Sequence, residues 1–510
     1  MTIANTDAGR RAALKQWLGL GVLVLPVLLL FMMLTVLFLA IPHLAAELRP
    51  SGTQTLWIID IYGFLMAGLL VTMGTLADRL GHRRLLVIGA AVFAVASLFA
   101  AGTSDPGWLI VWRAVLGVAA ATQMPATLGM IFATFTDHRR RGVAVGVWSG
   151  AISVGTAIGP VVGGALLEAF SWRAAFLVAV PVMAIVVIGA PLLLPAHRNP
   201  GAGRVDLLSV LLSLATLLPI VYGLKEVGKG GHPAVAVAAF VVGFAFGAWF
   251  VRRQLRLPEP LLDVRLFANR VVGGALGVFL LSATALGGVY LLVTQYLQLV
   301  QGLSPLQAGL WVLPAAALLV VVSTGSPLLA RRFRPGRLIA AGLVIQVVGY
   351  LMLTQVGATG GLPLLVAGFI VLYPAVAPSM ALTTSLVVGS VPPQKAGAAS
   401  GLATTCSDLG ISLGIAILGS VAAAVYRVRI STELPAGLPP EAAAAGRDTL
   451  DAAIATTQTL PGELAAAVLT PAREAFTSGL TTAAAIAAVI AAAAAVLALR
   501  RLASVPPTNP

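Results

Sequence analysis

The sequence predicts an all-α, polytopic membrane protein with fourteen transmembrane helices in a six, two and six arrangement. Of the 510 residues, 59% are hydrophobic and only 10% are charged, whereas a soluble domain carries about 25% charged residues. At about 20 apolar residues per span, a dozen or more spans fit. Two motifs from the first half also recur in the second. This composition excludes a soluble enzyme, a disordered chain and a nucleic-acid-binding protein.

Apolar stretches bounded by charges or by Pro and Gly clusters define the individual helices. The first follows Arg10, Arg11 and Lys15 and is too long for a cleaved signal peptide, so we expect an uncleaved span. The predicted helices cover residues 17–40, 56–77, 84–102, 108–135, 142–167, 173–195, 205–224, 233–252, 272–298, 306–329, 337–356, 362–390, 398–426 and 479–500.

The positions of the basic residues predict the orientation of these helices. With the N-terminus inside, 23 of the 32 Lys and Arg residues fall in cytoplasmic segments and 8 in outer segments, while Arg113 lies within a span. Basic residues concentrate in cytoplasmic loops. We therefore expect a multi-pass protein of the cell membrane with both termini in the cytoplasm, and the net charge of +14 needs no nucleic-acid partner.

Two internal repeats divide the chain into halves. Residues 76–86 (LADRLGHRRLL) return in degraded form at 329–339, and residues 141–146 return at 396–401. Parallel halves imply a substrate site near the midplane and rocking of one half against the other. The predicted units are an N-terminal six-helix bundle (1–200), two inserted helices with linkers (201–255) and a C-terminal six-helix bundle (256–510).

One long outer loop, residues 427–478, lies between the last two predicted spans. It contains two alanine-rich helical stretches that begin at prolines, and it serves either as a surface decoration or as a lid over the outer mouth. Its acidic residues are Glu433, Glu441, Asp448, Asp451, Glu463 and Glu474.

Few ionisable residues lie inside the predicted spans, and each is a functional candidate because a buried charge is costly there. Asp60 and Arg113 lie at similar depths in the second and fourth helices, so they can form an ion pair that couples to protons or acts as a strut. Asp408 lies near mid-membrane in the thirteenth helix. It is either a proton carrier or cation contact, or a hydrogen-bonded packing residue.

The loop after the second helix places an aspartate among arginines and glycines at the cytoplasmic rim. A carboxylate there can bind a neighbouring helix N-terminus or the arginines of an adjacent loop, which favours a latch that holds the outward-facing state. The latch residues are Gly74, Asp78, Arg79, Gly81, Arg83 and Arg84.

The fifth helix carries a stripe of small residues, which lets helices approach closely. Tight packing of this kind blocks leak in an antiporter, although ordinary helix packing would explain it too. The stripe includes Gly155, Gly159, Pro160, Gly163 and Gly164.

Several kinds of chemistry have no sequence signal. The single cysteine, Cys406, excludes an internal disulfide, and the five histidines are scattered, so we expect no metal site. We find no phosphate-binding loop and no nucleophile with a base, so we expect neither a cofactor nor an enzyme. Tyr62 and Trp148 are the aromatic candidates for a substrate cavity, and Tyr290 and Tyr373 are cavity or interface aromatics.

Three motifs resemble those of the major facilitator superfamily. Residues 74–84 (GTLADRLGHRR) are similar to its loop signature, residues 113–117 (RAVLG) to its fourth-helix motif and residues 155–164 (GTAIGPVVGG) to its antiporter motif. The fourteen-helix layout then resembles the drug:proton antiporter-2 family. The resemblance covers essentially the whole chain and implies a monomeric, proton-coupled exporter.

Further stretches are similar to the quaternary-ammonium-compound multidrug efflux pumps of that family, namely residues 51–62, 170–176 and 262–267. Those pumps carry acidic residues at positions that align with Met33, Leu319 and Thr404, all uncharged here. Export of dications is therefore not expected. Met33 and Thr404 join the candidate cavity residues.

Three functions remain open from the sequence. The first is proton-coupled efflux of lipophilic, neutral or monocationic drugs, dyes or antiseptics. The second is export or flipping of an endogenous lipid, antibiotic or metabolite with weak or no proton coupling. The third is a membrane scaffold or sensor, against which the intact latch and antiporter motifs argue.

Overall fold

The computed structural model is all-helical over the residues that it describes, with no strand among them. It leaves out residues 1, 197–205, 229–231, 258–259, 261–263, 266–268, 391–395, 435–439, 458–460 and 508–510. At a further set of helical positions only the backbone is described: 2–13, 52, 67, 71, 75, 138–139, 142, 153, 207, 224–225, 228, 396–401, 404–405, 408, 440–442 and 445.

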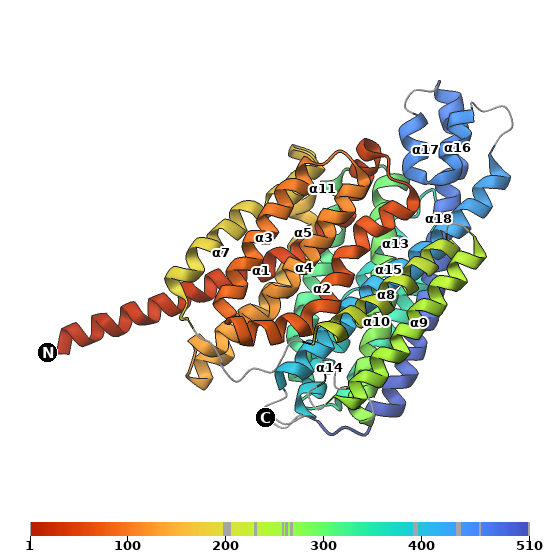
Figure 1. The fold of residues 1–510 in the computed structure, drawn as a ribbon. Helices are drawn as coiled ribbons and strands as arrows, with labels where there is room; N and C mark the ends of the chain where they lie inside the picture. The colour runs from red at the N-terminus through yellow and green to blue at the C-terminus, as the bar shows by residue number, and fades with distance from the viewer. Residues whose placement is uncertain are drawn as a thin grey trace.

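The helices form two groups and an inserted pair (Figure 1). The N-terminal group comprises α1 (Thr2–Leu48), α2 (Gly52–Leu80), α3 (His82–Gly102), α4 (Pro106–Thr134), α5 (His138–Ala169), α6 (Trp172–Leu177) and α7 (Ala179–Leu193). The inserted pair is α8 (Leu207–Gly228) and α9 (Pro233–Arg256). The C-terminal group comprises α10 (Arg270–Gln295) with η2 (Tyr296–Val300), α11 (Pro305–Leu329), α12 (Pro335–Leu353), α13 (Leu362–Leu372) with η3 (Pro374–Val376), α14 (Ala377–Gly389), α15 (Ala396–Glu433) and α18 (Gly462–Leu502).

Two short helices, α16 (Pro440–Asp448) and α17 (Leu450–Thr457), project beyond the bundle. We call these two helices the cap, and the end of the bundle beneath them the cap end. Both chain termini lie toward the opposite end (Figure 1).

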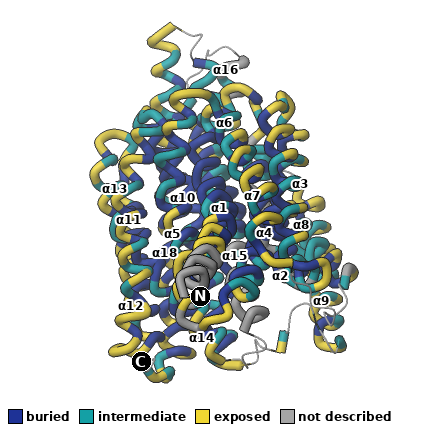
Figure 2. Tube along the Cα trace, turned by 90° about the vertical axis from the view of Figure 1, so that its left-hand side faces the viewer, coloured by how far each residue is buried: buried dark blue, intermediate teal, exposed yellow. Residues whose placement is uncertain are grey.

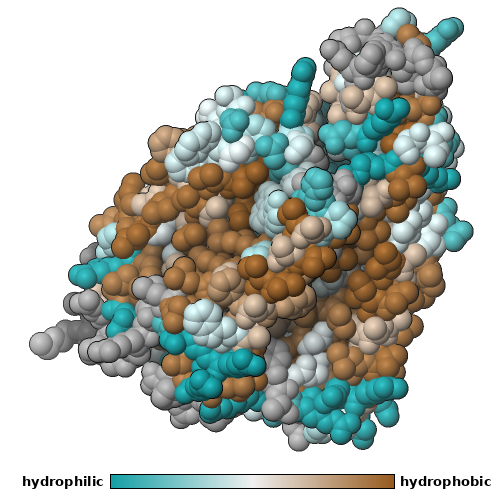
Figure 3. All heavy atoms as spheres, turned by 45° about the vertical axis from the view of Figure 1, so that its right-hand side comes forward, coloured by the Kyte–Doolittle hydropathy of each residue, from teal (hydrophilic) through white to brown (hydrophobic). Residues whose placement is uncertain are grey.

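Thirteen helices in the described part of the chain are long and apolar enough to cross a membrane, and the shorter apolar helix Leu208–Gly223 accompanies them. These helices correspond to the fourteen that the sequence predicts. Buried residues run through the centre of the bundle and exposed ones lie on its outside (Figure 2). The middle of the surface is hydrophobic and its two ends are hydrophilic (Figure 3), as expected of a bilayer-spanning protein.

The last helix begins earlier than the sequence predicts. It starts at Gly462 rather than at residue 479, and α15 continues to Glu433, so the connection between them is shorter than the predicted loop 427–478. Apolar periodicity alone misses this extension, because residues 462–478 carry Glu463, Arg473 and Glu474. An acidic residue in the first turn favours the helix through its dipole.

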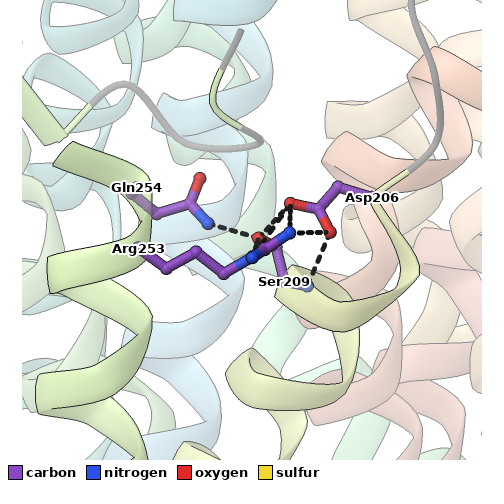
Figure 4. A network of polar contacts seen from close by, with 4 residues as sticks. All are labelled: Asp206, Ser209, Arg253 and Gln254. Carbon is purple, nitrogen blue, oxygen red and sulfur yellow. Dashed lines mark hydrogen bonds and ion pairs between the residues drawn. The ribbon is translucent and has the colours of Figure 1, made fainter. Parts of the chain in front are cut away.

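A polar network joins the ends of the two inserted helices (Figure 4). The Arg253 Nη2 atom lies 2.9 Å from Oδ1 of Asp206, and Gln254 donates to the Ser209 hydroxyl at 2.6 Å. Ser209 in turn donates to Asp206 at 2.5 Å. Loss of solvent raises the pKa of Asp206, but the hydrogen bonds from Arg253 and Ser209 outweigh this and leave the pKa below its ordinary value. The network therefore clamps α8 to α9.

Candidate functional site

A central cavity of about 120 Å³ lies between the two six-helix groups. The N-terminal group contributes α1 and α5, and the C-terminal group contributes α10, α11, α15 and the segment from α13 to α14. None of the described residues that line it is charged. They are Phe31, Leu34, Thr35, Phe38, Ile152, Thr156, Leu286, Gly287, Tyr290, Leu319, Ser323, Tyr373, Val376, Met380, Ser407 and Ile411.

An aromatic cluster forms part of the wall of this cavity. The ring of Tyr290 lies 5.3 Å from that of Phe38 and 5.5 Å from that of Tyr373, so the cluster joins the two halves. Phe369 stacks on Tyr373 at 5.0 Å. The Tyr290 hydroxyl has no hydrogen-bond partner among the described residues. Aromatic faces attract lipophilic cations, and ligand pockets are lined mainly by apolar and aromatic side chains with few polar groups. At about 120 Å³ the cavity is smaller than the roughly 300–1,000 Å³ of such pockets, so a drug-sized ligand requires it to widen.

The structure brings Asp60 and Arg113 together, as the sequence predicts from their equal depth. Both are buried, with 1% of each residue exposed. The Arg113 guanidinium donates from Nε to the carbonyl of Ile58 at 2.9 Å and from Nη2 to that of Ile59 at 3.2 Å, and it lies 4.5 Å from the Tyr62 ring centroid. Asp60 interacts with it electrostatically. Arg113 therefore holds α4 against the segment of α2 that carries Asp60.

Other candidates from the sequence lie apart from the central cavity. Met33 is buried within α1, and Tyr62 packs on Arg113. Trp148 donates to the Thr127 hydroxyl at 3.0 Å, so its polar edge is directed toward α4. Leu319 is the exception among these candidates, because it lines the central cavity.

The side chains of Thr404 and Asp408 lie outside the described residues. The structure places both positions in α15, and the neighbouring Ser407 lines the central cavity.

The glycines of the antiporter motif serve two different interfaces. A Cβ atom on Gly155 would lie 2.5 Å from the Leu28 carbonyl, and one on Gly163 would lie 2.9 Å from Val36, so this face of α5 packs on α1. Gly159 packs on α1 in the same way. Gly164 instead faces the other half, where a Cβ atom would lie 2.5 Å from Cα of Leu306 in α11.

The two halves meet toward the cap end through backbone contacts. The Pro160 carbonyl packs directly against Gly309 of α11. Close by, the Ser304 hydroxyl donates to Glu168 at 3.1 Å. A second contact joins α2 to α15, where a Cβ atom on Gly63 would lie 2.6 Å from Oγ of Ser412. The α5–α11 contacts therefore form a tight seal between the halves toward the cap end, whereas Gly63 and Ser412 meet near the middle of α2 and α15.

The predicted latch residues lie at the opposite end, around the turn between α2 and α3. Gly81 makes this turn with a φ of 92°, a conformation that favours glycine. The Asp78 carboxylate lies 3.4 Å from Nε2 of His82, and Arg83 donates to the Leu194 carbonyl at 3.0 Å. Gly74 lies beside Pro125 of α4, and Arg79 and Arg84 are exposed.

The sequence analysis missed most of the residues that line the central cavity. Phe31, Leu34, Phe38 and Met380 are ordinary apolar residues in spans rich in such residues, so no sequence signal distinguishes them. Of the aromatic candidates from the sequence, Tyr290 and Tyr373 line the cavity, whereas Tyr62 and Trp148 are not among its described lining residues.

Two six-helix groups that face each other across a central cavity define a secondary transporter. The comparison with family models agrees, since the model described as "Major Facilitator Superfamily" matches residues 23–415. The chain belongs to this superfamily and is a transporter rather than an enzyme.

The chain is similar along its length to drug efflux proteins. It is 43% identical to the multidrug efflux pump LfrA of Mycolicibacterium smegmatis over 94% of this chain and 95% of that protein. It is 34% identical to the methyl viologen resistance protein SmvA of Salmonella typhimurium (91% and 93% covered). It is 30% identical to a tetracenomycin C resistance and export protein of Streptomyces glaucescens (94% and 90% covered).

Solved structures share the fold. A bacterial homologue of the human lysosomal transporter Spinster, in an inward-facing and unoccupied conformation, superposes with a TM-score of 0.66 at 19% identity, covering 96% of this chain and 98% of that one. The nucleoside transporter NupG gives a TM-score of 0.58 at 13% identity, with 95% and 98% covered. At these identities the likeness supports the fold alone.

Proposed function

We propose that this chain exports lipophilic, neutral or monocationic compounds in exchange for protons, by alternating access. The observation that carries the proposal is the central cavity, which both halves line with apolar and aromatic side chains and with no described charge. Similarity to multidrug and antibiotic efflux proteins supports it.

The proposed orientation places both termini in the cytoplasm of a cell-membrane protein and the cap outside, in keeping with the distribution of basic residues. The glycine contacts between α5 and α11 then lie on the outer side of the membrane. The turn around Asp78 acts as the latch of the outward-facing state. The chain works as a monomer within the bilayer.

We assign proton coupling to Asp60, together with Arg113, and to Asp408. Burial of Asp60 beside a guanidinium makes its protonation depend on how closely the two groups approach. Both residues belong to the N-terminal group, so their approach changes only if α2 and α4 move against each other within that group and the hydrogen bonds from Arg113 to the backbone of α2 rearrange. Asp408, next in sequence to the cavity residue Ser407, is the second acid to which we assign proton coupling.

The test is substrate-induced proton release in proteoliposomes, with tetraphenylphosphonium as the lipophilic monocation. Asp60→Asn and Asp408→Asn should each lower pH-driven transport at least about tenfold, the magnitude of losing one ionised partner. Asp105→Asn is the matched control, because asparagine also caps the N-terminus of α4. Full coupled transport in both coupling variants would contradict the assignment.

A second candidate function is uncoupled export of an endogenous lipid, antibiotic or metabolite. The absence of charge among the described residues of the central cavity favours it. It predicts that efflux continues in both coupling variants without a pH gradient, which the same proteoliposomes measure.

A further inference from the structure

A second and larger cavity, of about 710 Å³, lies at the cap end. Its walls come from the cap-end segments of α2, α10, α15 and α18, and α17 covers it. This volume is within the range of small-molecule sites, about 300–1,000 Å³. We call this space the cap cavity. On α10 its lining residues Leu291, Leu292 and Gln295 follow directly after Tyr290, which lines the central cavity, so the cap cavity lies further toward the cap end.

The charged residues of the cap cavity are two aspartates and one arginine. Asp448 and Asp451 come from the cap and Arg427 from α15, so the described lining is net negative when both acids are ionised. Oδ1 of Asp451 is buried and has no hydrogen-bond partner among the described residues. Loss of solvent raises the pKa of Asp448, and it raises that of Asp451 to about 6. Asp451 is therefore ionised at neutral pH, with one oxygen that lacks a donor.

An unsatisfied hydroxyl lies in the same cavity. Ser420 of α15 is 3% exposed, and its Oγ has no hydrogen-bond partner within the described part of the chain. Buried polar groups in proteins are almost always satisfied. A site with two unsatisfied oxygens therefore has acceptor capacity left for a ligand.

The remaining wall is apolar and aromatic. Leu56, Ile59, Leu450 and Phe476 line it, together with Tyr426. The Tyr426 hydroxyl donates to the Gly446 carbonyl at 2.7 Å, so the aromatic wall also anchors the cap. An apolar surface with a net negative charge matches a lipophilic organic cation rather than a small inorganic ion or an anion.

The cap cavity reaches the Asp60 region through Ile59. Ile59 lines the cavity, and its carbonyl accepts the hydrogen bond from Arg113. The next residue along α2 is Asp60. A ligand in the cap cavity thus lies beside the segment to which we assign proton coupling.

We propose that the cap cavity is a second binding site for lipophilic organic monocations, on the release side of the transport route, where Asp448 and Asp451 supply the counter-charge. Its role in release rests on the proposed efflux function, whereas the binding itself does not. Protons and the organic cation compete for the same carboxylates, so an acidic exterior releases the cation.

The competition depends on the groups around Asp451. Asp448, Tyr426 and Arg427 line the same cavity; Tyr426 interacts electrostatically with Asp451 and Asp448, and Arg427 with Asp448. The other elements packed against α17 carry His43 and Glu47 on α1, Arg447 on α16, Tyr296 on η2, and Glu463, Arg473 and Glu474 on α18, none of which is among the described lining residues.

The test labels a cysteine placed in the cavity. Cys406 is the single cysteine and is buried, so Cys406→Ser gives a silent background for Ser420→Cys in the full-length chain in proteoliposomes. We expect a cationic trimethylammonium methanethiosulfonate to react about tenfold faster than the anionic sulfonate, relative to their rates with a free thiol. Tetraphenylphosphonium should slow the labelling.

Neutralising the two acids should remove both effects. In Asp448→Asn/Asp451→Asn the cation preference falls about tenfold and tetraphenylphosphonium no longer protects. Glu463→Gln/Glu474→Gln is the matched control, because it removes two exposed acids of α18 that are not among the described lining residues. The proposal would be overturned if both reagents label residue 420 at equal relative rates in the chain that keeps both aspartates and tetraphenylphosphonium does not slow the labelling. It would also be overturned if the control variant loses the cation preference as much as the double aspartate variant does.

Equilibrium dialysis of tetraphenylphosphonium covers the case in which residue 420 does not label. We expect two ions per wild-type chain and one per Asp448→Asn/Asp451→Asn chain, and one ion per wild-type chain overturns the site. If the protein transports tetraphenylphosphonium but shows neither protection from labelling nor a second bound ion, the proposed efflux function stands and only the cap-cavity site is refuted. If tetraphenylphosphonium protects residue 420 and a second ion binds, but no probe is transported, the cap-cavity site stands and the efflux function is refuted.

Discussion

Asp206 and Asp451 occupy similar places in the chain but very different surroundings. Each stands at the start of a helix, α8 and α17 respectively. Asp206 receives hydrogen bonds from Arg253 and Ser209, and these hold its pKa below the ordinary value. Oδ1 of Asp451 has no partner among the described residues, and desolvation raises the pKa of this group to about 6.

The contrast separates a structural carboxylate from one that is available for binding. A carboxylate whose oxygens accept hydrogen bonds stabilises the folded protein. Removing one of its donors lowers stability, because the carboxylate then keeps a desolvated charge without a partner. A desolvated carboxylate with an oxygen that accepts no hydrogen bond lowers the stability of the folded protein. Binding of a cation or a proton to that carboxylate restores the lost stability. The two aspartates should therefore respond in opposite ways to the same changes.

The largest expected effect is on the clamp between α8 and α9. Arg253→Leu leaves Asp206 without its guanidinium and should lower the free energy of unfolding by about 2 kcal/mol, the range for hydrogen bonds to charged groups. Thermal unfolding in detergent measures it. Arg252→Leu, at an exposed position in the same helix, is the control, and equal shifts in the two variants would show that the network is not a clamp.

The pH dependence should have opposite signs at the two sites. The lowered pKa of Asp206 stabilises the protein above the ordinary aspartate pKa, and this contribution is lost as the pH falls through the folded-state value. The raised pKa of Asp451 makes its ionised form destabilising, so Asp451→Asn should be more stable than wild type by about 1 kcal/mol at pH 7.5. The difference should narrow as the pH falls below the folded-state pKa of about 6, and it should vanish only below the ordinary aspartate pKa of about 3.9.

Melting curves of wild type, Asp206→Asn and Asp451→Asn between pH 4 and pH 8 would measure both trends. Asp206→Asn should be the less stable chain at neutral pH. If the melting temperatures of Asp206→Asn and Asp451→Asn change with pH in the same way, the two aspartates do not differ in the way proposed here.

The smallest expected effect compares two buried serines. Ser209 bonds to Asp206, Arg253 and Gln254, so Ser209→Ala should cost about 1 kcal/mol of stability. Ser420 makes no such bond in the described structure, so Ser420→Ala should leave unfolding unchanged. It should also leave tetraphenylphosphonium binding unchanged, because that ion carries no hydrogen-bonding group. A destabilised Ser420→Ala chain would mean that this hydroxyl is structural.

The sequence predicts the helices well because hydropathy is a local property. The positions of the spans and the shared depth of Asp60 and Arg113 follow from counting residues along helices. The central cavity could not be predicted, because Phe38 and Met380 differ from other apolar residues only in where the bundle places them.

The cap cavity was hidden for a related reason. The sequence shows Asp448 and Asp451 as two of six acids in a loop, alongside the exposed Glu463 and Glu474. Asp448 and Asp451 differ from the other acids only in the folded structure. There α18 extends back to Gly462 and α17 folds so that the two aspartates lie over α15. Desolvation, which sets the pKa of Asp451, depends on tertiary packing and leaves no trace in the local sequence.

The seal between α5 and α11 has a consequence for how substrate range can evolve. Gly164 faces the backbone of Leu306, and the Pro160 carbonyl faces Gly309, so the closed end is held by main-chain surfaces. Side chains of the central cavity take no part in these two contacts. Under the proposed function, mutations of the central cavity can therefore change which compounds are exported without loosening these contacts, so a new substrate can be gained one cavity residue at a time.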